Sequence, residues 1–427
     1  MESASQSNAS SPVRSCSPIS VDTPATEPSD LFDNLDNFLH EIPRCQYILV
    51  TGGLGYIGSH TTLELLKSSY NVIVIDNLSN SLHSVLDRIR LLASNYHEQK
   101  GTKMPSLKFH EHDYRDRTAL QQLLEGYQAS PRWDSPNSKI AGVIHFAGYK
   151  AVEESIREPL KYYANNVSGL IDFVTTLGDF GIKTFIFSSS ATVYGTSATP
   201  GLPLKEELCV HKEEVAKDPE GTEKIVQPGC TGITNPYGRT KWISEAMLAD
   251  LAASDPEWTI VALRYFNPIG CDSSGHLGEN PKRIPTNLLP LVVKVMTGQN
   301  KELQMFGTDW DTKDGTAVRD FIHVTDLARG HISALNAASD GRLRENFRTF
   351  NLGARHGHSV MEVVKAMQDA SAKHIPAKGT GRRLGDVGSC VAEVSRSYDE
   401  LQWKTEKTLQ DACRDTSHFL NVSGLSS

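Results

Sequence analysis

Short apolar runs alternate with segments of helical length from Tyr47 onward. Alternation of this kind is typical of stacked βαβ units with a parallel sheet. The pattern therefore predicts an α/β fold built on a doubly wound parallel sheet. The strands that we expect are YILV (47–50), NVIVID (71–76), LKFHEH (107–112), GVIHFA (142–147), KTFIFSS (183–189) and TIVALRY (259–265).

The alternation weakens after about Asn267, where Pro and Gly become frequent. We expect a sheet domain over residues 45–266 and a smaller C-terminal α/β substrate-binding domain over 267–427, with some chain crossing back to the sheet. Residues 1–44 are rich in Ser and Pro and lack an apolar signal core, so they are expected to be a disordered tail. The charged stretch 199–234 is either a lid or a solvated insertion.

Composition favours a small-molecule ligand. The net charge of -8 disfavours nucleic acid and anionic membrane as main partners, and no run reaches the roughly 18 apolar residues of a membrane span. The seven cysteines are scattered without C-x-x-C spacing, which favours a reducing, cytoplasmic location and no metal site. They are Cys16, Cys45, Cys209, Cys230, Cys271, Cys390 and Cys413.

The first candidate site is TGGLGYIG, residues 51–58, with glycines at 52, 55 and 58. A strand precedes it, an apolar helical pattern follows it (Leu63, Leu65, Leu66), and Asp76 ends the next predicted strand. These are the conditions for a dinucleotide site in a Rossmann fold, although a plain glycine turn remains the alternative. A carboxylate at the ribose repels a 2′-phosphate, so NAD is expected rather than NADP.

The second candidate site pairs Tyr237 with Lys241, one turn apart on a predicted helix. An ammonium about 6 Å away stabilises phenolate by roughly 3 kcal/mol, about two pK units, which makes Tyr237 a candidate base. The positive nicotinamide of bound NAD would act in the same direction. Ser190, in SSSATVYG, is placed to hydrogen-bond a substrate hydroxyl. Taken alone, a Tyr-Lys pair at this spacing is typical of an incidental surface contact. A cluster of serines, taken alone, is typical of the end of a strand, where the hydroxyls satisfy backbone groups.

Together with these motifs, the stretches HFAGYKAVEES, LRYFNPIG, GTAVRDFIHVTDLA and RRLGDV resemble the nucleotide-sugar epimerases of the extended short-chain dehydrogenase/reductase family. The resemblance runs from about Tyr47 to Phe419. It implies interconversion of UDP-glucose and UDP-galactose through a 4-keto sugar, with NAD held tightly throughout. It also implies a homodimer.

The resemblance implies a role for each matching position. Ser190, Tyr237 and Lys241 would be catalytic. The cofactor would contact Gly52, Gly55, Tyr56, Ile57, Gly58, Asp76, Asn77, Leu78, Ser79, Asn80, Ser81, Asp113, Tyr114, Phe146, Ala147, Gly148, Tyr149, Lys150, Asn165, Ser188, Ser190, Tyr237, Lys241, Tyr265 and Phe266. The nucleotide-sugar would contact Lys150, Ser190, Tyr237, Asn267, Asn287, Leu288, Gln304, Met305, Phe306, Arg319, Arg383, Asp386 and Cys390.

Two questions about function stay open. Cys390 is small, which leaves room for the N-acetyl group of UDP-N-acetylglucosamine or UDP-N-acetylgalactosamine, or it is a packing residue. A 4,6-dehydratase or decarboxylase of the same family is the alternative enzyme. A dehydratase commonly has an Asp-Glu pair after the catalytic Ser, and Ser190 is followed by Ala191 and Thr192. A non-catalytic NAD sensor would be expected to lack part of the Ser, Tyr and Lys set.

Overall fold

The computed structural model describes residues 46–128, 138–198, 202–217, 221–282, 285–383 and 385–424. The predicted tail, Cys16 and Cys45 lie outside these ranges.

Seven parallel strands form the central sheet, in the order β12-β8-β5-β4-β1-β2-β3. Six of them are the predicted runs, so the doubly wound fold is confirmed. The seventh strand, FRTFNL, is not predicted by hydropathy because Arg348, Thr349 and Asn351 lie among its apolar residues. These three polar side chains are buried. The strands are β1 (Tyr47–Thr51), β2 (Asn71–Ile75), β3 (Leu107–His110), β4 (Ile140–His145), β5 (Thr184–Ser188), β8 (Thr259–Tyr265) and β12 (Phe347–Leu352).

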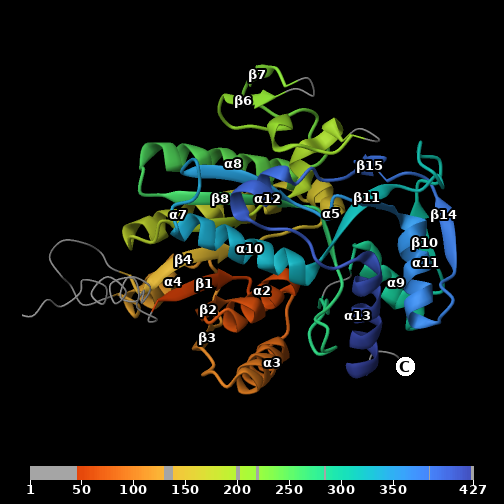
Figure 1. Cartoon of the computed structure of the whole chain (residues 1–427), viewed down its shortest axis with the longest axis horizontal. Coiled ribbons are helices and arrows are strands. Elements are labelled where there is room, and N and C mark those ends of the chain that lie inside the picture. Colours follow the sequence, from red (N-terminus) through yellow and green to blue (C-terminus); the bar gives the residue numbers. More distant parts are fainter. Residues whose placement is uncertain are drawn as a thin grey trace, which may run out of the picture. The chain divides into compact units, whose positions relative to one another are not determined.

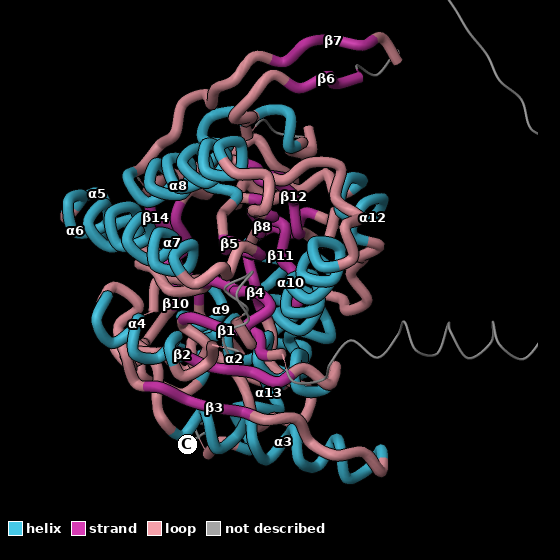
Figure 2. Tube along the Cα trace, turned by 90° about the vertical axis from the view of Figure 1, so that its left-hand side faces the viewer, coloured by secondary structure: helices cyan, strands magenta, loops and turns pink. Residues whose placement is uncertain are grey.

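Successive side chains of each strand point to opposite faces of the sheet, and helices cover both. Ile48 and Val50 of β1 pack in one core cluster, whereas Leu49 packs in the other. In Figure 2 strands β4, β5 and β8 lie between α7 and α8 on one side and α10 on the other. The first face is covered by α2 (Tyr56–Lys67), α3 (Ser84–Lys100) and α10 (Val324–Ser339); the second is covered by α4 (Arg117–Glu125), α7 (Gly169–Asp179) and α8 (Pro236–Ser254).

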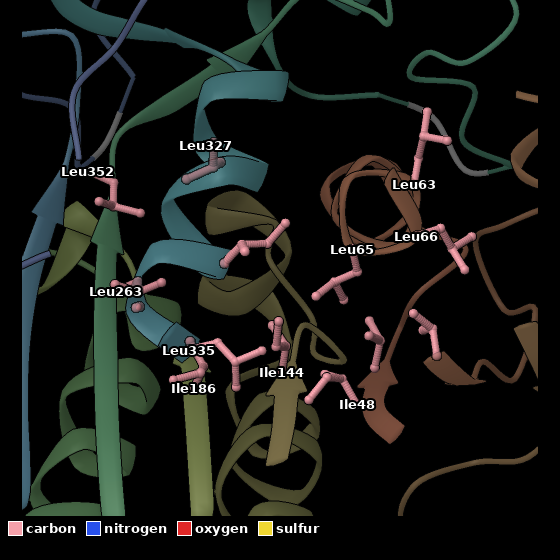
Figure 3. Packing of buried hydrophobic residues seen from close by; sticks show 14 of the residues in the cluster. Ile48, Leu63, Leu65, Leu66, Ile144, Ile186, Leu263, Leu327, Leu335 and Leu352 are labelled. Carbon is pink, nitrogen blue, oxygen red and sulfur yellow. The ribbon is translucent and has the colours of Figure 1, made fainter. Parts of the chain in front are cut away.

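The first of these clusters is seen in Figure 3, where Ile48, Ile144, Ile186 and Leu263 of the strands face Leu65 of α2 and Leu335 of α10. All six side chains are buried. This packing fixes α2 against the sheet, and so fixes the turn from β1 into α2 on which the site depends.

The C-terminal part, confirmed as a smaller α/β region, has two small sheets. β11 pairs with β9, β13 and β15, and β10 pairs with β14. Most of this part lies beside the large sheet on the right of Figure 1, while α10 and β12 return to that sheet. Its further elements are β9 (Asn267–Ile269), α9 (Leu288–Met296), β10 (Leu303–Phe306), β11 (Val318–His323), β13 (Gly357–Ser359), α11 (Val360–Ser371), β14 (Ala377–Thr380), β15 (Ser389–Cys390), α12 (Ser395–Leu401) and α13 (Leu409–Val422).

The charged stretch 199–234 has two different parts. Its base is buried, with Leu204, Glu206, Cys209 and Val210 at most 2% exposed. Beyond the base, an antiparallel hairpin projects at the top of Figure 1. The hairpin consists of β6 (Glu214–Lys217) and β7 (Glu223–Val226), and the short helical segments elsewhere are α5 (Val152–Arg157), α6 (Pro159–Tyr163), η1 (Ala164–Ser168), η2 (Ala191–Ser197) and η3 (Glu206–Leu208).

Candidate active site

A cleft of about 790 Å³ opens at the carboxyl ends of the strands, beside the point where β1 has β2 on one side and β4 on the other. In doubly wound sheets this reversal of strand order leaves a crevice for the ligand. No described residue of 199–234 lines it. The predicted residues that line it are Gly52, Gly55, Tyr56, Ile57, Gly58, Asp76, Asn77, Ser79, Asn80, Ser81, Tyr114, Phe146, Ala147, Gly148, Tyr149, Lys150, Asn165, Tyr237, Lys241, Tyr265 and Asn287.

The glycine turn needs residues without side chains for reasons of space. Gly52 has φ +70°, and a Cβ there would lie 2.9 Å from the Ala147 nitrogen. A Cβ at Gly58 would lie only 2.2 Å from the Gly52 carbonyl oxygen. Helix α2 then starts from Gly55 with no side-chain cap, so backbone N–H groups of its first turn stay available to an anion in the cleft.

Asp76 is held in place by the loop that surrounds it. Its buried carboxylate accepts hydrogen bonds from the backbone N–H of Leu54 (3.0 Å) and Leu78 (2.9 Å) and from the Ser81 hydroxyl (2.7 Å). Leu78 does not line the cleft, and its backbone is left-handed (φ +53°). An ionised carboxylate has about four acceptor positions, so one is left for a ligand hydroxyl.

Tyr237 and Lys241 lie one turn apart near the start of α8, as their spacing predicts. Asn235 caps this helix by accepting from the Gly238 N–H at 2.8 Å. The Lys241 ammonium lies 6.0 Å from the centre of the Tyr237 ring and donates to the Ser188 carbonyl at 2.6 Å.

Ser190 lies outside the cleft lining but within reach of Tyr237. Hydrogen bonding from Ser190 opposes the rise in the Tyr237 pKa, and the Ser190 hydroxyl accepts from the N–H of Thr192 (3.2 Å) and from its hydroxyl (3.0 Å). The fold thus brings the three predicted catalytic residues together from two separate stretches of chain.

Burial dominates the acid–base properties of this group. It raises the pKa of Tyr237 to about 12, against the opposing hydrogen bond from Ser190. It also lowers the pKa of Lys241 to about 8, against the opposing charge of Glu245. The expected lowering of the Tyr237 pKa by Lys241 is therefore not found in the protein alone. Removal from water destabilises the phenolate by more free energy than an ammonium 6 Å away provides.

Glu245 and Arg264 support the catalytic turn, and neither was predicted. Both are fully buried, and Arg264 donates to Glu245 through Nη2 (2.6 Å) and Nε (3.1 Å). Glu245 also accepts from the Ser189 hydroxyl, and His211 lies 2.7 Å from it. Arg264 keeps the pKa of Glu245 low, at about 2, in spite of its burial. Glu245 is four residues beyond Lys241, so the helical spacing that joined Tyr237 to Lys241 was a usable signal.

Some of the predicted nucleotide-sugar residues form a second group in the C-terminal part. Asp386 accepts from Arg319 (3.4 Å) and from Arg383 (3.1 Å), and the Arg383 guanidinium lies 4.6 Å from the centre of the Phe306 ring. Arg319 pairs with Cys390 between β11 and β15. The two guanidiniums share one carboxylate, so they keep N–H groups free for a doubly charged anion.

Other predicted positions are less closely associated with either group. Gln304 donates to Glu302 at 2.9 Å, and Lys150 forms an ion pair with Glu279 at 3.4 Å. The predicted cofactor residues outside the cleft lining are Leu78, Asp113, Ser188, Ser190 and Phe266, and the predicted nucleotide-sugar residues outside it are Ser190, Asn267, Leu288, Gln304, Met305, Phe306, Arg319, Arg383, Asp386 and Cys390.

No group of three or more His, Cys, Asp or Glu side chains in the described residues is arranged to hold a metal ion. Among their helices, none combines the length and the apolar character needed to cross a membrane.

Comparison with known proteins gives consistent matches. The model of the family described as "NAD dependent epimerase/dehydratase family" matches residues 48–353. UDP-glucose 4-epimerase 2 of Arabidopsis thaliana is 42% identical over 368 residues, which cover 86% of this chain and 93% of the relative. The UDP-glucose 4-epimerase of Bacillus subtilis is 40% identical over 382 residues, which cover 89% of this chain and 99% of the relative.

Solved structures agree with the sequence relatives. The UDP-glucose 4-epimerase of Bifidobacterium longum, in complex with NAD+ and UDP, has a TM-score of 0.74 and 39% identity, covering 90% of this chain and all of that one. The UDP-Glc/GlcNAc 4-epimerase of Campylobacter jejuni has a TM-score of 0.64 and 31% identity, covering 88% of this chain and 99% of that one.

Gly58→Ala tests the glycine turn. The new methyl group meets the Gly52 carbonyl, so we expect about 1–3 kcal/mol less free energy of unfolding and loss of the dinucleotide that the turn is predicted to hold. Urea denaturation and the absorbance of cofactor released on denaturation measure the two effects. Gly381→Ala, where no atom lies within 4 Å of the new Cβ, is the control and should change stability by less than about 0.5 kcal/mol. Equal behaviour of the two variants would contradict the packing argument.

Proposed function

The chain belongs to the NAD dependent epimerase/dehydratase family, and from this we propose that it is a UDP-glucose 4-epimerase, which interconverts UDP-glucose and UDP-galactose. The observation that carries the proposal is the convergence of Ser190, Tyr237 and Lys241 beside the cleft of the glycine turn. The named relatives at about 40% identity over most of the chain support the same activity.

The residues of the cleft fit NAD. The turn has no room for a Cβ at Gly52 or Gly58, so backbone can approach a pyrophosphate closely. The uncapped start of α2 suits the negative charge of that pyrophosphate, and Asp76 has an acceptor position left for a ribose hydroxyl. When bound, NAD supplies a hydride acceptor and donor for C4 of the sugar.

Tyr237 is the proposed acid and base. As phenolate it would accept the proton of the sugar 4-hydroxyl, and as phenol it would return that proton to the 4-keto oxygen, which forms the opposite epimer. The hydrogen bond from Ser190 orients the phenol oxygen, and Lys241 keeps a positive charge near it while fixed on the Ser188 carbonyl. Lys241 acts in this way only while it is protonated. Because its pKa is about 8, it is mostly protonated at neutral pH.

Arg319 and Arg383 are the proposed anchor for the diphosphate. An anchor at that end holds the nucleotide while the hexose turns to present its other face. Their separate hydrogen bonds to the two oxygens of Asp386 restrain both guanidiniums before the substrate arrives, which lowers the entropy lost on binding. By analogy with the family we also propose a homodimer, and we propose a cytoplasmic location because the five described cysteines are free thiols.

An assay of the purified enzyme tests the proposed reaction. Protein purified without added NAD, supplied with UDP-galactose, should form UDP-glucose, which NMR follows through the sugar signals. A 4-keto-6-deoxy product would identify a dehydratase instead, and no conversion by protein that retains NAD would contradict the epimerase. In the same assay Tyr237→Phe should reduce kcat by at least about 100-fold, since it removes the proton acceptor. The exposed Tyr398→Phe is the matched control and should retain kcat.

Arg383→Ala tests the diphosphate anchor. Loss of a charge-assisted hydrogen bond, about 1.5–3 kcal/mol, should raise KM for UDP-galactose about 10- to 100-fold and change kcat much less. The neighbouring Arg382 has nearly the same exposure but binds Asp309 and stacks on Trp310, so Arg382→Ala should leave KM almost unchanged. Similar KM values for both variants would contradict the assignment.

Cys390→Tyr tests a wider substrate range. The small side chain of Cys390, beside Arg319, supports the proposal that N-acetylated UDP-sugars are also substrates. A tyrosine there should lower kcat/KM for UDP-N-acetylglucosamine about 10-fold or more relative to UDP-glucose, whereas Cys390→Ser should keep the ratio of the two. A ratio that is the same in Cys390→Tyr and the unchanged protein would remove this part of the proposal.

A further inference from the structure

A pair of backbone hydrogen bonds closes the base of the insertion. The Val210 N–H donates to the Gly229 carbonyl at 3.2 Å, and the Gly229 N–H donates to the Val210 carbonyl at 2.9 Å. The two residues form an antiparallel bridge below the β6–β7 hairpin. Two residues that exchange both bonds are a hydrogen-bonded pair, and this fixes the register of their neighbours.

On the side of this bridge away from the hairpin, the next two residues in the same register are Cys209 and Cys230. Opposite residues beside a hydrogen-bonded pair have Cα atoms about 4.5 Å apart, inside the range of about 4.4–6.8 Å that a disulfide requires. Cys209 has extended backbone angles (φ −153°, ψ 93°), as this pairing needs. Both cysteines pack in one apolar cluster with Val193, Tyr194 and Phe266.

The two thiols differ in access. Cys209 is 1% exposed, whereas Cys230 is only partly buried. An oxidant therefore reaches Cys230 first, and Cys209 is the resolving thiol behind it. Both are free thiols in the described structure.

We propose that Cys209 and Cys230 are a reversible oxidation site that closes to a cross-strand disulfide in the presence of a small-molecule disulfide such as oxidised glutathione. The Cys230 thiolate attacks a glutathione sulfur, which forms a mixed disulfide and releases one glutathione thiolate. The Cys209 thiolate then attacks the Cys230 sulfur and releases the second. In sum, two protein thiols lose two electrons and two protons, and one oxidised glutathione becomes two thiols.

The cross-link would stabilise the active geometry rather than switch it off. The Cys209 carbonyl accepts from Arg264 at 2.7 Å, and Arg264 holds Glu245, which accepts from Ser189 beside the proposed catalytic serine. The new bond joins positions that are already opposite each other in this arrangement. It also closes the loop 210–229, whose conformational freedom in the unfolded chain would fall.

Oxidation is expected to be slow at neutral pH. Burial raises the pKa of Cys209 to about 12, with Arg264 opposing and Glu245 adding to the rise, and burial raises the pKa of Cys230 as well. The charged groups near Cys230 are Arg239, Arg264 and Glu245. Only a small fraction of either thiol is then thiolate, so equilibration should take hours.

Mass spectrometry tests the site without depending on the enzymatic activity. The full-length protein, with its retained cofactor, is equilibrated with glutathione buffers of increasing oxidised fraction, quenched with acid and alkylated. We expect a loss of two hydrogen masses and a peptide that links Cys209 to Cys230, both reversed by a dithiol. Cys209→Ala and Cys230→Ala should each abolish the linked peptide, and Cys413→Ala, a buried cysteine in another cluster, should retain it.

Thermal inactivation adds a second readout. The oxidised protein should lose its activity at a temperature a few degrees higher than the reduced protein does. Neither alanine variant should show this difference. A mixed glutathione disulfide at Cys230 that never resolves in the unchanged protein would overturn the proposal. A peptide that links Cys230 to Cys390, or a linked protein without activity at low temperature, would overturn it too.

Discussion

Arg264 and Glu245 form an ion pair without solvent exposure, and the active-site turn depends on it. Two buried charges cost several kcal/mol each unless geometry and further hydrogen bonds compensate. Here Arg264 also donates to the Cys209 carbonyl and the Tyr194 hydroxyl, and Glu245 also accepts from Ser189. The pair therefore links four segments and fixes their relative positions: β8, α8, the turn after β5 and the base of the insertion.

The same burial that orders the site works against its chemistry. A phenol removed from water resists ionisation and an ammonium removed from water loses its proton more easily, and both effects are found at Tyr237 and Lys241. The protein opposes them locally, with the Ser190 hydrogen bond on the phenol and the Glu245 charge near the ammonium. Tyr237, the proposed base, is thus kept neutral in the protein alone.

The two ends of the proposed substrate meet different parts of the fold. The proton-transfer groups stand on the large sheet and α8, while the arginines come from β11 and the loop before β15. A hydrogen bond from the Thr234 hydroxyl to the Gly385 carbonyl, 3.1 Å long, connects the arginine loop to the segment that leads into α8. The proposed phosphate anchor and the proposed proton-transfer group are therefore connected although no single element carries both.

The sequence by itself determined the parallel sheet, the glycine turn and the pairing of Tyr237 with Lys241. Each of these follows from local periodicity or from steric need, which a few neighbouring residues express. Only the tertiary structure decided that β12 joins the sheet with buried polar side chains, that Arg264 meets Glu245, and that Val210 pairs with Gly229. Such contacts join distant residues, and their energies depend on burial and register, which no short pattern records.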